Sequence, residues 1–132
     1  MKTYLLEIVT PERKVYSDDV EMLITKAESG EIGILAGHTP LVASLAIGPL
    51  RVKKNGAEIL MSIMKGFMEV TETKVVILAE AAELAEEIDI DRAMRAKERA
   101  EERIRAKEDV LDFKRAELAL QRAVTRIKVS GK

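Results

Sequence analysis

The feature that most limits how this chain can fold is a change in side-chain pattern near residue 79. Before it, apolar residues occur in short runs or alternate with polar ones, and glycines and prolines separate the runs, as in β-strands joined by turns. From residue 79 to 87 the sequence AEAAELAEE has no β-branched residue, and alanines and long charged residues, the strongest helix formers, dominate the remainder of the chain. We therefore expect an α+β protein, with a strand domain over residues 1–84 and a helical domain over residues 85–132.

The first part predicts roughly seven to nine short strands, which favour a β-sandwich or flattened barrel. We expect the sheet to end at residue 79. Asn55-Gly56 predicts a tight hairpin turn between two of the strands. Because the chain has two Tyr, two Phe and no Trp, its core must be aliphatic and rich in methionine. The expected strands are 4–9, 20–25, 32–34, 41–47, 50–53, 59–63, 67–70 and 74–78.

The stretch IDIDRAMRAKERAEERIRAK, residues 88–107, predicts a helix opened by Asp89 or Asp91 as N-cap. Its apolar seam against a partner is thin, since it consists of Ala93, Ala96, Ala100 and Ile104. Each buried methyl group contributes only about 0.8 kcal/mol, whereas a ligand at 100 times its Kd contributes about 2.7 kcal/mol. A small molecule can therefore hold or release such a helix, which makes it a candidate switch.

A second helix is predicted from about Val110, with apolar residues at spacings of three and four. Glu108-Asp109 lies between the two helices, with no glycine or proline. The pair can therefore form an antiparallel hairpin or merge into one longer helix, and the sequence leaves both open. The expected apolar stripe of the second helix is Phe113, Ala116, Leu120, Val124 and Ile127.

Several function classes are disfavoured by the composition. There is no cysteine and one histidine, which excludes disulfides and thiolate chemistry and leaves no triad or evident metal site, so we expect no catalytic residues. No apolar stretch reaches transmembrane length and none near the N-terminus resembles a signal peptide, so a cytoplasmic location is expected. A nucleic-acid-binding module using the basic helix is an alternative, but glutamates interrupt the basic residues and aromatics for stacking are missing.

Three motifs in order resemble the epsilon subunit of bacterial F-type ATP synthases. They are SGEIGILAGHTPLV (residues 29–42), GFMEV (residues 66–70) and FKRAELALQRA (residues 113–123). The resemblance covers the whole chain and implies a β-sandwich of about ten strands followed by a two-helix hairpin. Two departures, Ala36 where proline is common and Lys65 where a small residue is usual, affect loop conformation.

The SGEIGILAGHTPL segment also has the character of a binding loop, because its glycines permit close backbone approach and it presents two polar groups, Glu31 and His38. A solvated Glu31 and a histidine that bonds only turn carbonyls are the simpler interpretation. The resemblance implies instead that both residues contact the gamma subunit and the membrane c-subunit ring.

The run IDIDRA (residues 88–93) is similar to a motif that accompanies ATP binding in epsilon subunits of bacilli. Arg92 and Arg99 are seven residues apart and share a helix face, which Arg103 extends. If the hairpin closes, arginines from both helices can converge on a triphosphate, while Glu83 and Asp89 face the base or ribose. The expected ATP-binding residues are Glu83, Ile88, Asp89, Arg92, Ala93, Arg99, Arg122 and Arg126.

Taken together, the resemblance implies a peripheral rotor subunit of the central stalk on the cytoplasmic side of the cell membrane, without lipid insertion or nucleic-acid binding. It implies ATP as a regulatory ligand, with or without Mg²⁺, that is not hydrolysed, since the chain lacks a Gly-x-x-x-x-Gly-Lys-Ser/Thr loop. Without ATP the hairpin is expected to extend along gamma and meet the beta subunit, inhibiting ATP hydrolysis. A purely structural rotor subunit that binds no nucleotide is the alternative.

Overall fold

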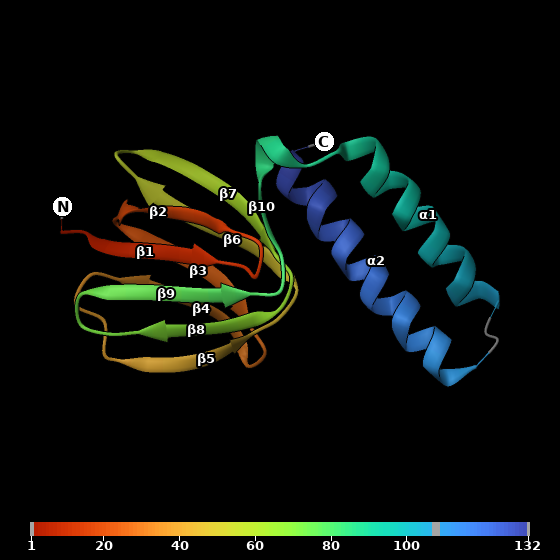
Figure 1. Cartoon of the computed structure of the whole chain (residues 1–132), viewed down its shortest axis with the longest axis horizontal. Coiled ribbons are helices and arrows are strands. Elements are labelled where there is room, and N and C mark those ends of the chain that lie inside the picture. Colours follow the sequence, from red (N-terminus) through yellow and green to blue (C-terminus); the bar gives the residue numbers. More distant parts are fainter. Residues whose placement is uncertain (1, 107–108, 132) are drawn as a thin grey trace.

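The computed structural model describes residues 2–106 and 109–131, which form one ten-stranded sheet followed by two helices (Figure 1). The strands are β1 (Tyr4–Val9), β2 (Lys14–Val20), β3 (Met22–Ala27), β4 (Gly30–Leu35), β5 (Leu41–Leu45), β6 (Gly48–Lys54), β7 (Ala57–Ile63), β8 (Gly66–Val70), β9 (Lys74–Ala79) and β10 (Ala82–Leu84). A 3₁₀ turn, η1 (Ala85–Glu87), leads into helices α1 (Ile90–Ala106) and α2 (Val110–Ser130). The expected α+β class is confirmed.

The sheet runs in the order β10-β7-β6-β3-β5-β8-β9-β1-β2, with β4 paired to β3. It curls into two layers around a common core, as the sandwich prediction required (Figure 1). Neighbouring strands are antiparallel except β1 and β9, which are parallel. The largest fully buried side chains are aliphatic residues and methionines: Leu6, Ile8, Leu23, Ile34, Leu45, Leu50, Met61, Ile63, Met68 and Ile77.

Two details of the strand prediction were wrong. The sheet does not end at residue 79, because the alanine/glutamate connector adds strand β10, in which Ala82 pairs with Ile63 of β7. The expected strand over residues 20–25 is interrupted at Glu21, and the residues before the interruption form β2, whose polar sequence gave no strand signal. In both cases pairing to a neighbouring strand, rather than local composition, determines the structure.

The turn between β6 and β7 has the backbone conformation that its Asn-Gly pair predicted. Asn55 and Gly56 have φ values of 52° and 76°, which suit the tight hairpin between β6 and β7. Lys65 has φ 62°, so a long side chain occupies a left-handed position that glycine normally takes. At Gly66 a Cβ atom would lie 2.1 Å from the carbonyl oxygen of Leu78, and therefore only glycine fits between β8 and β9.

The two helices form an antiparallel hairpin and do not merge (Figure 1). Asp109 caps α2 by accepting a hydrogen bond from the backbone nitrogen of Asp112 at 2.8 Å. Lys107 and Glu108, which belong to the predicted junction, lie outside the described residues. The helix that packs on the sandwich is α2, against β6 and β7, where Val129 is buried.

The seam between the helices consists of alanines at seven-residue spacing. Ala93 and Ala100 of α1 and Ala116 and Ala123 of α2 are buried, which places the helix backbones close together. The predicted stripe was wrong at Val124, which is 43% exposed. The true seam of α2 runs one residue earlier, through Ala123.

Candidate functional site

A cavity of about 540 Å³ lies between the two helices and the segment that joins them to the sandwich. This segment, η1 with residues 88 and 89, is called the hinge below. This volume is within the range of small-molecule sites. Its floor is made of alanines and its walls carry charged side chains from β10, η1, α1 and α2. The lining residues are Glu83, Glu87, Asp89, Arg92, Ala93, Ala96, Arg99, Ala100, Arg103, Ala119, Arg122 and Arg126.

The α1 wall is organised by its N-cap. Asp89 Oδ1 accepts a hydrogen bond from the backbone nitrogen of Arg92 at 3.0 Å, which confirms Asp89, and not Asp91, as the cap. The cap sets where the first turn begins. Because 3.6 residues complete a turn, Arg92, Arg99 and Arg103 then lie on the face that lines the cavity.

The α2 wall is tied to the sandwich. Arg122 and Arg126 are four residues apart and share a face of α2. The Nε atom of Arg126 lies 2.5 Å from Oε1 of Glu83 on strand β10, and the hydroxyl of Ser62 on β7 donates to the same oxygen at 3.5 Å. The unpredicted strand β10 thus places Glu83 where it can hold the helix.

Positive charge is in excess in this cavity, since five arginines face three carboxylates. Two of the carboxylates are already paired, Glu83 with Arg126 and Glu87 with Arg13. Within residues 2–106 and 109–131, Arg92, Arg99, Arg103 and Arg122 make no ion pair. Like charges around one cavity repel one another, and an anion placed between them would neutralise this repulsion.

The structure brings together all the residues expected to bind ATP except Ile88. Ile88 is buried at the hinge instead, where it ends η1 and does not line the cavity. Arg103 lines the cavity, as the arginine spacing indicated. Sequence reasoning missed Glu87, because its role depends on a partner from the other end of the chain and no local motif marks it.

Glu31 and His38 lie at opposite ends of strand β4. Glu31 pairs with Lys26 in the ladder and lines a groove beside Lys128 of α2. His38 follows the other end of the strand, where its Nδ1 lies 2.7 Å from the carbonyl oxygen of Thr39. A partner that contacts both residues must therefore span the length of the strand.

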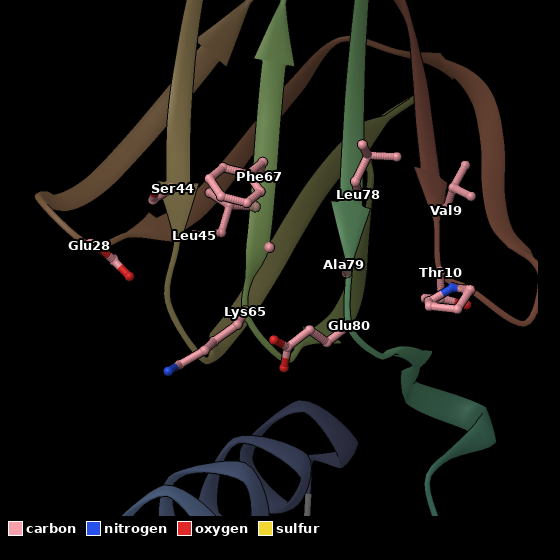
Figure 2. Close-up of a pocket in the computed structure, with 12 residues that line it drawn as sticks. Val9, Thr10, Glu28, Ser44, Leu45, Lys65, Phe67, Leu78, Ala79 and Glu80 are labelled. Carbon is pink, nitrogen blue, oxygen red and sulfur yellow. The ribbon is translucent and has the colours of Figure 1, made fainter.

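A second surface feature is an exposed apolar face on the sheet layer that does not carry the hairpin. Val42 of β5, Phe67 of β8 and Leu78 of β9 are 70%, 59% and 56% exposed. Phe67 and Leu78 are paired across the ladder and Val9 of β1 continues the row (Figure 2). Phe67, Leu78 and Val9 border a hollow of about 530 Å³ whose rim includes Lys65 and Glu80.

Neither a metal cage nor a membrane span is found in the described part of the chain. Over residues 2–106 and 109–131, no group of three or more His, Cys, Asp or Glu side chains is placed to hold a metal ion. None of the helices described is long and apolar enough to cross a membrane.

The chain matches two family models in succession. The ATP synthase delta/epsilon chain β-sandwich domain matches residues 3–85, and the long α-helix domain of the same chain matches residues 86–131. The chain belongs to the ATP synthase delta/epsilon family. The resemblance seen in the sequence motifs is thereby confirmed.

Among the curated proteins, members of this family from bacilli are similar over the full length. The ATP synthase epsilon chain of Bacillus velezensis is 53% identical over 99% of both chains, and that of Bacillus pumilus is 52% identical over the whole of both. A chain in the cryo-EM structure of the Euglena gracilis mitochondrial ATP synthase, with OSCP, F1 and c-ring, superimposes with a TM-score of 0.85. That chain is 26% identical, and the match covers 98% of this chain and 82% of that one.

Proposed function

We propose that this protein is a non-catalytic rotor subunit of a proton-translocating F-type ATP synthase, held peripherally on the cytoplasmic side of the cell membrane. In this role it couples the catalytic head to the membrane c-subunit ring, and its hairpin binds ATP and regulates hydrolysis. Full-length similarity to epsilon chains supports the assembly, as does the likeness to a chain from a structure that contains F1 and the c-ring.

The observation that carries the regulatory part is the convergence of arginines from both helices on one cavity. Guanidinium groups suit phosphate oxygens because they donate paired hydrogen bonds in a planar fork. Arg92, Arg99 and Arg103 come from α1, and Arg122 and Arg126 from α2. A triphosphate between them would neutralise both walls at once and would therefore hold the hairpin closed.

The hinge end of the cavity differs from the arginine end, because Glu83, Glu87 and Asp89 place carboxylate groups there. Carboxylates accept hydrogen bonds and would repel phosphate, so we assign the base and ribose to this end. Since the chain lacks a Walker loop, we infer that ATP is bound and not hydrolysed. Mg²⁺, where present, would be coordinated by the nucleotide's phosphates.

The small free energy of the hairpin seam makes regulation by a ligand workable. Burial of four alanine methyl groups contributes about 3 kcal/mol, and ATP at 100 times its Kd contributes about 2.7 kcal/mol. We infer that loss of ATP releases the helices to extend along gamma. Arg115 and Arg122 would then meet acidic residues of the beta subunit and block hydrolysis, a contact weakened by salt.

The exposed apolar face is proposed as the surface that gamma covers. Phe67 and Leu78 lie on the layer away from the hairpin, so a partner can occupy them whether the hairpin is closed or open. With ATP present to keep the hairpin closed, Phe67→Asp should abolish co-assembly with gamma, whereas Met94→Asp, which changes a half-exposed apolar residue of α1, should leave it intact. Co-purification of the variants with gamma tests this, and equal recovery of both overturns it.

Calorimetric titration of ATP into the full chain tests the regulatory function. The expected result is 1:1 binding that Arg92→Ala and Arg122→Ala each weaken at least about tenfold, as befits a charge-assisted contact. Arg95→Ala is the matched control, because Arg95 is an exposed arginine of α1 that does not line the cavity. Absence of binding at millimolar ATP would reduce the protein to a structural rotor subunit.

A further inference from the structure

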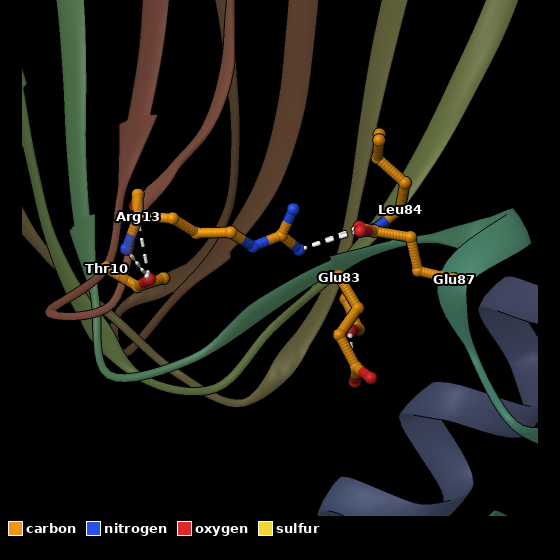
Figure 3. A network of polar contacts seen from close by, with 6 residues as sticks. Thr10, Arg13, Glu83, Leu84 and Glu87 are labelled. Atoms are coloured by element: carbon orange, nitrogen blue, oxygen red, sulfur yellow. Dashed lines mark hydrogen bonds and ion pairs between the residues drawn. The ribbon is translucent and has the colours of Figure 1, made fainter.

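One ion pair joins the sandwich to the hinge of the hairpin, between Arg13, which lies outside the cavity, and Glu87, which lines it. The Nη2 atom of Arg13, in the turn between β1 and β2, lies 2.9 Å from both carboxylate oxygens of Glu87 on η1. Figure 3 shows the Arg13 side chain reaching across to this carboxylate. The pairing lowers the pKa of Glu87 and raises that of Arg13, so both stay charged at neutral pH.

Arg13 is held in place by its own turn. The backbone nitrogen of Thr10 donates to the carbonyl oxygen of Arg13 at 2.9 Å, and the Arg13 nitrogen donates to the Thr10 hydroxyl at 3.3 Å. Thr10 is itself buried, which anchors the turn to the core. The arginine therefore starts from a fixed backbone position, and less conformational entropy is lost when its side chain pairs.

The Glu87 side chain is also fixed, by a hydrogen bond within its own turn. Its Oε1 accepts a hydrogen bond from the backbone nitrogen of Leu84 at 2.9 Å, which closes the η1 turn. The same side chain lines the cavity, whereas Arg13 does not. Glu87 thus connects three parts of the molecule: the sandwich through Arg13, the hinge turn through Leu84, and the wall of the candidate nucleotide site.

We propose that the Arg13–Glu87 pair is a latch that holds the hinge in the closed position and so sets the affinity of the cavity for its ligand. The binding-competent state is the closed hairpin, and the apparent affinity of a ligand scales with the fraction of molecules in that state. Arg13 acts as a positioning residue, through Glu87, without touching the ligand. The effect on affinity rests on the proposed nucleotide site, but the closing of the hinge does not.

The hinge is tested by distance measurements between spin labels on the full chain. Because the chain has no cysteine, Ser29→Cys in the β3–β4 turn and Leu111→Cys near the start of α2 give two unique, exposed labelling sites. Arg13→Ala should lower the ratio of closed to open molecules about two- to fivefold without nucleotide, as expected for a partly exposed ion pair. ATP affinity should fall in proportion to the closed fraction.

Three further variants separate the latch from other effects. Glu87→Gln keeps an oxygen for the Leu84 hydrogen bond but removes the charge, and should match Arg13→Ala in the ratio of closed to open molecules without nucleotide. Combining Arg13→Glu with Glu87→Arg should restore part of the closed population. Lys53→Ala, which removes an exposed cation of the sandwich outside any ion pair of the described residues, is the control and should change nothing.

The closed population from spin-label distances and the ATP affinity together distinguish failure of the latch from failure of the nucleotide site. A closed population that stays at its wild-type value in Arg13→Ala without ATP overturns the latch, whatever ATP does. If the closed population falls in Arg13→Ala while ATP neither binds nor closes the wild-type hairpin, the latch stands and the proposed nucleotide function fails.

Discussion

The sandwich and the hairpin of this protein bury very different amounts of apolar surface within themselves. The sandwich interior contains whole leucine, isoleucine and methionine side chains, such as Leu6, Leu50 and Met61, with no exposed surface. The hairpin seam buries alanine methyl groups. A leucine side chain contributes about 1.5–3 kcal/mol on burial and an alanine methyl about 0.8 kcal/mol. The first region is therefore the more stable body, and we propose that small contacts shift the second between closed and open states.

The polar contacts follow the same division. Hydrogen bonds of the ladders unite the sandwich strands, whereas α2 is tied to the sandwich by Arg126–Glu83 and the hinge by Arg13–Glu87. Such partly exposed, solvent-screened pairs each contribute little to stability. This is too little to make the hairpin part of one rigid core, but it is enough to bias a two-state equilibrium.

The largest expected effect is in the sandwich core. Leu50→Ala should lower the free energy of unfolding by about 2–5 kcal/mol, because it leaves a cavity among fully buried neighbours. Leu120→Ala, in the partly exposed face of α2, should cost less than about 1.5 kcal/mol. Urea unfolding measures both, with tyrosine fluorescence reporting the sandwich, since Tyr4 and Tyr16 lie in β1 and β2. Equal losses in the two variants would contradict the proposed difference between the regions.

The fold class was predictable because each region carries a dense local signal: alternation and turns in the strands, and alanine with charged residues in the helices. The arginine row of α1 was predictable from spacing, since Arg92 and Arg99 repeat on one helix face, but its convergence with Arg122 and Arg126 was expected only if the hairpin closed. Strand β10 was not predictable, because its hydrogen bonds come from β7 and not from its own composition. Nor was the contact of Glu87, whose partner Arg13 is 74 residues away.

The register of the two helices shows the same limit of sequence-based prediction at the level of single residues. Val124 fits the apolar spacing of the second helix, yet it faces solvent while Ala123 is buried. Spacing alone does not say whether the closest approach of two helices needs a large residue or a small one. Here alanines occupy the buried seam positions, and Val124 lies on the exposed side of α2.

A substitution in the seam should break the hairpin without affecting the sandwich. Ala123→Leu forces a larger side chain into the closest approach of the helices and should cost about 1–3 kcal/mol, which is comparable with the whole seam. The hairpin should open and its helical circular dichroism should melt before the tyrosine signal changes. Val124→Leu is the control, since that residue is exposed. A single melting transition for both probes in Ala123→Leu would show that the regions are not independent.

The smallest expected effect is a pH dependence confined to the sandwich. Glu7 of β1 lies 2.5 Å from Lys74 and 2.9 Å from Lys14, which lowers its pKa from 4.5 to about 2. A carboxylate with a lowered folded-state pKa stabilises the protein above its unfolded pKa and loses that contribution as the pH falls toward the folded value. Glu7→Gln should therefore be less stable than wild type at pH 7, and the difference should shrink between about pH 5 and pH 2. Tyrosine-monitored unfolding across this range measures it, and Glu69→Gln, which removes an exposed carboxylate of β8 outside any ion pair of the described residues, is the control. If Glu7→Gln instead lowered the closed fraction of the hairpin at neutral pH, the ion pairs of the sandwich and of the hinge would be coupled, and the separation of the two regions would fail.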